Sequence, residues 1–167
     1  MWHFSEDPSI TVFAPVEEFV WAIDTRHAPT FWFPRDCPRA CAWASPTTSA
    51  ADLERFFGWT SSRRIHVIEQ AWLPAVQACS LYAYRLPEDS FSPHSVGGYW
   101  VSSSTVAPLE VVEVGDLLAR HAAAGIELRI SPSVWPWWTD VVSSTLDFSG
   151  SRLRNCTVPM PPELAQL

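Results

Sequence analysis

Side chains able to do chemistry are concentrated in three short segments of the chain. These segments are Trp2–Asp7, Trp21–Asp24 and Phe33–Arg39. The first reads as a strand, and because side chains alternate across a strand, His3 and Ser5 would share one face. A histidine and a hydroxyl on one face can hydrogen-bond a ligand or move a proton. The same pattern also fits two polar side chains that simply face solvent.

The third segment carries Arg35 and Arg39 in a stretch that prolines stiffen. Guanidinium groups held in a fixed geometry bind phosphates and carboxylates through paired hydrogen bonds. The alternative is a structural ion pair of Arg35 with Asp36 or another carboxylate. Cys37 lies between the arginines, where positive charge would favour the reactive thiolate. No histidine partner is recognisable by spacing, so a buried, inert thiol fits the sequence better.

Other polar groups give weaker signals. A triad of Ser5, His27 and Asp24 is formally possible but lacks the Gly-x-Ser-x-Gly turn that usually presents such a serine. His66 and His121 lie in apolar stretches and are predicted to be structural. The four cysteines are irregularly spaced. We expect reduced thiols and predict no metal site.

Composition excludes several classes of function. The 11 basic residues are all arginines, so lysine Schiff bases, covalent pyridoxal phosphate and a P-loop lysine are excluded. The net charge of −7 would repel nucleic acid and anionic membranes. No leader-like start and no apolar run of ~20 residues is recognisable. The sequence therefore predicts a cytoplasmic protein that does not bind nucleic acid or membrane.

The elements that must position these groups are short, because fifteen prolines punctuate the chain. Expected helices are Ser49–Phe57, Ala71–Ala78, Leu117–Ala124 and Trp135–Leu146. Expected strands follow the opening segment at Phe19–Ile23, Arg39–Ala44, Arg64–Ile68, Leu81–Leu86, Tyr99–Ser103, Leu109–Val114 and Ile126–Ile130. Strands outnumber helices without alternating with them, which predicts an α+β fold with a mixed, mostly antiparallel sheet. We expect a single domain over residues 1–157 and an irregular tail over 158–167.

Two resemblances add to this interpretation. The strings WHFSEDPSITVFAP, VWAID, FPRDCPR, GYWVSSSTVAPLEVVEVGDLL and FSGSRLRN resemble an uncharacterised bacterial family, a domain of unknown function, over nearly the whole chain. More weakly, the chain resembles the ADP-ribosyltransferase-like fold. His3 matches the histidine of that fold's first strand, Trp21 its second, aromatic-bearing strand, and Tyr99–Ser103 its third region. The sequence departs at Gly97 or Gly98, where the fold's glutamate is expected.

The second resemblance implies NAD as a donor. It implies that His3 hydrogen-bonds a ribose, that aromatic side chains stack on nicotinamide and that arginines contact the pyrophosphate. In such chemistry a carboxylate stabilises positive charge at the ribosyl carbon. Because glycine replaces the acid here, another carboxylate has to substitute. The candidates are Glu6, Asp24, Glu69 and Glu110.

The resulting hypothesis is a small nucleotide-binding enzyme that resembles NAD-dependent ADP-ribosyltransferases and transfers to a small molecule or protein. Its predicted catalytic residues are His3, Ser5 and Arg35. Its predicted cofactor-binding residues are Trp21, Asp24, Arg39 and Tyr99. One alternative is a small-molecule-binding protein or tailoring enzyme that acts on an aromatic metabolite without NAD, suggested by the ten tryptophans. A third is an interaction module with exposed aromatics. The oligomeric state stays open.

Overall fold

The computed structural model describes residues 1–94, 97–162 and 164. The chain forms two compact units that interleave in sequence. Unit 1 comprises residues 1–35 and 79–117, and unit 2 comprises residues 36–78 and 118–167. Each unit has its own sheet. Because each unit gathers two separate stretches of chain, neither could be recognised from a boundary in the sequence.

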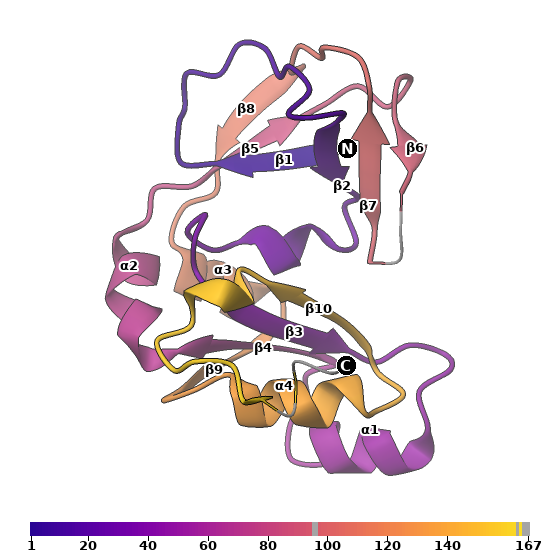
Figure 1. Ribbon diagram of the computed structural model, residues 1–167, viewed down its shortest axis with the longest axis vertical. Helices are drawn as coiled ribbons and strands as arrows, with labels where there is room; N and C mark the ends of the chain where they lie inside the picture. The colour runs from indigo at the N-terminus through magenta and orange to yellow at the C-terminus, as the bar shows by residue number, and fades with distance from the viewer. Residues whose placement is uncertain (95–96, 163, 165–167) are drawn as a thin grey trace. The chain divides into compact units, whose positions relative to one another are not determined.

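Within the described ranges, unit 1 is built on a six-stranded sheet in the order β6-β7-β2-β1-β5-β8 (Figure 1). Its elements are β1 (Trp2–Ser5), β2 (Val20–Ile23), the 3-10 helix η1 (Ala28–Phe31), β5 (Tyr82–Arg85), β6 (Ser92–Pro93), β7 (Tyr99–Ser102) and β8 (Glu110–Glu113). All neighbouring strands pair antiparallel. One face buries an apolar cluster that includes Phe13, Val20, Ala22 and Tyr84. The other face carries Trp21 and Tyr99.

Unit 2, as described, has a four-stranded sheet in the order β10-β3-β4-β9. Its elements are β3 (Arg39–Trp43), α1 (Ala50–Phe57), β4 (Arg64–Glu69), η2 (Gln70–Trp72), α2 (Leu73–Ala78), α3 (Leu117–Ala123, in unit 2 from Leu118), β9 (Glu127–Ser131), α4 (Trp135–Val142), β10 (Asp147–Ser151) and η3 (Leu153–Asn155). The β4–β9 pair is parallel and the other pairs are antiparallel.

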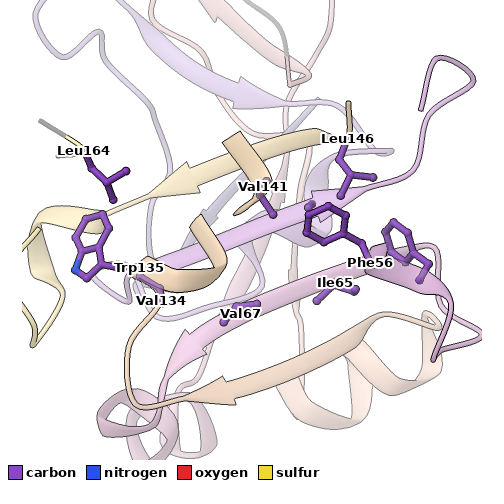
Figure 2. Close-up of a cluster of buried hydrophobic side chains, with 10 residues drawn as sticks. Phe56, Ile65, Val67, Val134, Trp135, Val141, Leu146 and Leu164 are labelled. Atoms are coloured by element: carbon purple, nitrogen blue, oxygen red, sulfur yellow. The ribbon is translucent and has the colours of Figure 1, made fainter. Parts of the chain in front are cut away.

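The central strands of unit 2 are buried. Every residue of β3 is buried, as is every residue of β4 except Arg64. On one face, Ile65 and Val67 pack against α1 and α4 through Phe56 and Val141 (Figure 2). Strands covered in this way read as near-continuous apolar runs, which is why both were recognisable in the sequence.

The first helix begins as the sequence predicts. The Ser49 side chain accepts a hydrogen bond from the Asp52 backbone N–H at 3.1 Å, so it is an N-cap. The Asp52 carboxylate accepts hydrogen bonds from the backbone and hydroxyl of Thr145 at 2.8 and 2.6 Å. The cap therefore also ties α1 to the segment before β10.

The predicted α+β class with mostly antiparallel pairing is confirmed, with the strands divided between two sheets. The helix expected over Trp135–Leu146 ends at Val142, and β10 follows it. β10 is poor in strand-forming residues and exists because it pairs with β3 along its whole length. In the expected tail, Leu164 is buried and the Val158 carbonyl accepts a hydrogen bond from the Trp135 indole. Residues 163 and 165–167 of that tail lie outside the described residues.

None of the helices in the described part of the chain is both long and apolar enough to cross a membrane.

Candidate functional site

His3 lies where strands β1 and β2 separate. Among the described residues, β1 pairs with β5 at four positions but with β2 at one, Trp2 with Ile23. Beyond that pair the His3 ring reaches the neighbouring strand, and its Nδ1 lies 2.9 Å from the Trp21 carbonyl oxygen. A carbonyl can only accept, so Nδ1 carries the hydrogen and Nε2 of the neutral ring is an acceptor.

The surroundings of His3 keep it neutral. Burial lowers the pKa of the imidazole below its usual 6.5, and the positive charge of Arg35 lowers it further, against the opposing effect of the Trp21 carbonyl. The ring also packs on Phe13, with 4.6 Å between ring centroids. At neutral pH His3 is therefore an oriented hydrogen-bond acceptor, suited to a hydroxyl group of a ligand.

The other two predicted catalytic residues lie near His3. Ser5 is buried, and its Oγ accepts a hydrogen bond from the Asp7 backbone N–H at 3.1 Å. Arg35 is exposed, its backbone N–H donates to Glu6 Oε1 at 2.7 Å, and its charge acts on His3. The structure thus brings a neutral imidazole and a cation together, with Ser5 shaping the turn that follows β1.

Trp21 and Tyr99 lie on the opposite face of the sheet from His3. Register partners share a face, and Trp21 pairs with Val101 while Ile23 pairs with Tyr99. The Trp21 ring contacts Tyr99 and His94 edge-on, with centroids 6.2 and 4.8 Å apart. Trp21 remains 43% exposed. These rings form an aromatic surface that a planar ligand can contact.

Asp24 joins this aromatic face to the glycine pair. Its Oδ1 accepts hydrogen bonds from the backbone N–H and the ring Nδ1 of His27, both at 2.8 Å. Its backbone N–H donates to the Gly98 carbonyl at 3.0 Å. A Cβ at Gly98 would come within 2.5 Å of Asp24 Oδ2 and closer still to His27 Nδ1. The Asp24 carboxylate therefore stands directly beside Gly98.

Arg39, the fourth predicted cofactor-binding residue, belongs to unit 2. It is 3% exposed, and its Nη1 donates to the Cys37 carbonyl at 3.0 Å. Cys37 is itself fully buried, with its Sγ 3.6 Å from the Pro38 carbonyl. Of the two proline-flanked arginines, Arg35 is exposed and Arg39 is used within the fold. The burial of Cys37 matches the inert alternative.

A family model described as a family of unknown function, DUF6886, matches residues 2–156. The chain belongs to DUF6886. The match includes residues of both units of this DUF6886 protein, and it confirms the resemblance to an uncharacterised domain family. No curated protein matches the chain. No solved structure matches it either.

Two features of the DUF6886 protein had little signal in its sequence. The His27 contact with Asp24 depends on the turn after β2, although the three-residue spacing could have suggested it. His66 and His121, predicted to be structural, are buried and in contact, with Nδ1 and Nε2 3.0 Å apart. In the described residues, no group of three or more His, Cys, Asp or Glu side chains is placed to hold a metal ion.

Proposed function

We propose that this DUF6886 protein binds a nucleotide at unit 1 and acts as an enzyme similar to NAD-dependent ADP-ribosyltransferases. The observation that carries the proposal is His3, a neutral imidazole bridging two separating strands with its acceptor nitrogen directed away from the strand contact. A ribose hydroxyl is the natural donor to such an acceptor. Trp21, on the face of the sheet opposite His3, offers an exposed ring that a planar base can contact.

Asp24 is the best candidate for the substituting carboxylate. Glu69 lies in unit 2, where its Oε2 is bound by Thr157, and Glu110 pairs with Arg85 on β8. Glu6 accepts from the Arg35 backbone. Asp24 stands beside Gly98 and next to Trp21 and Tyr99, and 29% of its side chain is exposed.

In the proposed reaction the glycosidic bond between the ribosyl carbon and nicotinamide breaks, and the electron pair leaves with nicotinamide. Positive charge grows on the ribosyl carbon, where the Asp24 carboxylate would stabilise it by several kcal/mol. An acceptor on a small molecule or protein then bonds to that carbon and loses its proton. Arg35 would contact a phosphate group. We expect this activity in the cytoplasm.

The test is nicotinamide release from NAD together with the thermal shift that NAD causes. We expect Asp24→Asn to lower release by at least ~100-fold, the scale of losing one electrostatic stabiliser, with the NAD-induced shift retained. His3→Ala should weaken NAD binding by about tenfold, the scale of one hydrogen bond. Trp59→Ala is the control, since Trp59 in unit 2 is 93% exposed. Absence of both release and thermal shift in the wild type would reject the proposal.

The aromatic surface favours a second candidate function, the binding or modification of an aromatic metabolite without NAD. Trp21 offers an exposed ring beside Tyr99 and His94. Quenching of tryptophan fluorescence by simple aromatic ligands but not by adenine nucleotides, lost in Trp21→Ala, would support this function over the first.

A further inference from the structure

Strand β8 forms one edge of the unit 1 sheet and is unusually exposed. It is last in the strand order, and all four of its residues are exposed. Val111 and Val112 are each 46% exposed although they point to opposite faces, and Leu109 just before them is 57% exposed. Proteins normally protect a sheet edge with charges, prolines or a covering segment. β8 has a glutamate at each end and Pro108 shortly before it, but its two central valines leave apolar surface on both faces, onto which another strand can add.

The backbone of β8 has hydrogen-bonding groups directed outward. In an antiparallel pair the hydrogen-bonded positions alternate. The Val114 N–H donates to the Leu81 carbonyl, so the next positions facing β5 are Val112 and Glu110. The N–H and C=O groups of Val111 and Glu113 therefore point away from the sheet.

The acidic residues on and near β8 favour a basic binding partner. Glu110 and Glu113 lie on β8, and Glu88 and Asp89 are exposed on the loop that follows β5. Arg85 on the neighbouring strand β5 forms an ion pair with Glu110. A second copy of this chain would place its own glutamates against those of β8, and each copy carries a net charge of −7. Like charges across paired strands are unfavourable, so the edge suits a basic strand.

A small cavity adjoins the beginning of β8. Its volume is about 210 Å³. Its lining residues are Met1, Trp2, Thr25, Arg85, Leu86, Pro87, Glu88 and Leu109. The volume is below the ~300–1,000 Å³ of small-molecule sites, so the cavity suits one side chain. Leu109 links it to the strand edge, and Trp2 and Leu86 offer apolar walls, while Glu88 is paired with the Met1 α-ammonium at 3.4 Å.

We propose that β8 binds an extended, basic segment of a partner protein by strand addition, with one apolar side chain of that segment in the cavity beside Leu109. Main-chain hydrogen bonds to Val111 and Glu113 supply affinity, while the cavity and the glutamates supply specificity. Neither His3 nor Asp24 lies on β8 or lines the cavity, so the proposal does not depend on NAD.

The probe is a fluorescein-labelled synthetic octapeptide of alternating lysine and valine, whose binding is followed by fluorescence anisotropy. Val111→Pro removes an outward N–H, and a proline whose missing N–H faces solvent is tolerated on an edge strand. We expect it to weaken binding by at least tenfold. Val111→Ala keeps the N–H and is the matched control, with an expected change below threefold. A peptide of alternating glutamate and valine should not bind measurably.

Glu113→Arg provides an independent check that leaves the backbone intact. This substitution should weaken binding of the lysine peptide and strengthen binding of the glutamate peptide. Added salt should reduce both changes in binding. Equal binding to wild type and Val111→Pro, equal binding of the two peptides, or no binding of the lysine peptide would overturn the proposal. Dimerisation of the wild type that Val111→Pro abolishes would assign the edge to a second copy and also overturn it.

Discussion

Selected strands of the two sheets differ in how far they are buried. In unit 2, every residue of β3 is buried, and the β4–β9 pair is parallel. In unit 1, all four residues of β8 are exposed and Trp21 on β2 is 43% exposed. Apolar burial stabilises the fold, whereas reachable polar and aromatic side chains on a rigid strand can meet a ligand. The comparison teaches that the central strands of unit 2 contribute mainly to stability, whereas β8 and Trp21 of unit 1 are accessible from solvent.

The largest expected change in the free energy of unfolding is at a buried strand of unit 2. Ile65 on β4 is fully buried, so Ile65→Ala should lower the free energy of unfolding by ~2–5 kcal/mol. Val112→Ala on β8 should lower it by less than about 1 kcal/mol, because Val112 is half exposed. Urea denaturation of both variants measures the difference. Similar losses at the two positions would break the comparison.

The next effect compares two glycines of unit 1. Gly98 and Gly115 both have φ of +79°, but a Cβ at Gly115 meets nothing within 4 Å, whereas one at Gly98 collides with Asp24 and His27. Gly115→Ala should cost about 1 kcal/mol for the left-handed backbone. Gly98→Ala should cost ~1–3 kcal/mol more, because the Asp24–His27 contact must move. Equal thermal melting temperatures would show that this contact is not rigid.

A smaller effect is expected from pH. Burial holds the pKa of His66 well below its usual 6.5, and His121, Arg64 and Arg39 add to the shift. Below pH 6.5 the unfolded chain therefore binds a proton that the folded chain does not, and stability falls as pH falls. Each pH unit over which only the unfolded chain is protonated at one histidine costs ~1.4 kcal/mol.

His66→Leu is the variant that assigns this pH dependence. Its unfolding free energy between pH 6.5 and 5 should fall less steeply than that of the wild type, by close to one proton. Unchanged steepness would mean that other groups cause the acid sensitivity. His3 in unit 1 is shifted in the same direction, so it should contribute with the same sign.

The smallest effect is at the start of α1. Ser49→Ala removes the acceptor for the Asp52 N–H and should lower the unfolding free energy by about 1 kcal/mol. Ser49→Asp retains a capping oxygen and should recover most of the loss. An alanine variant as stable as the wild type would show that Asp52 and Thr145 hold the helix end without the serine.

Local patterns predicted much of the fold but less of the site. The capping residue Ser49 and the apolar run of β4 are local signals, and both elements form where the sequence places them. β10 could not be predicted, because its stability depends on pairing with β3, more than 100 residues earlier. Arg35 and Arg39 look equivalent in sequence, but one is exposed and the other is buried in a strand.

The amino-acid sequence by itself determined which chemistry is available: no lysine, a histidine and a serine on one face of the first strand, and an α+β pattern of short elements. Tertiary structure decided where that chemistry lies. It directed His3 and Trp21 to opposite faces of one sheet, brought Asp24 to Gly98 and left β8 uncovered. The physical reason is that side-chain alternation is a property of one strand, whereas register and strand order depend on pairing between residues far apart in the chain.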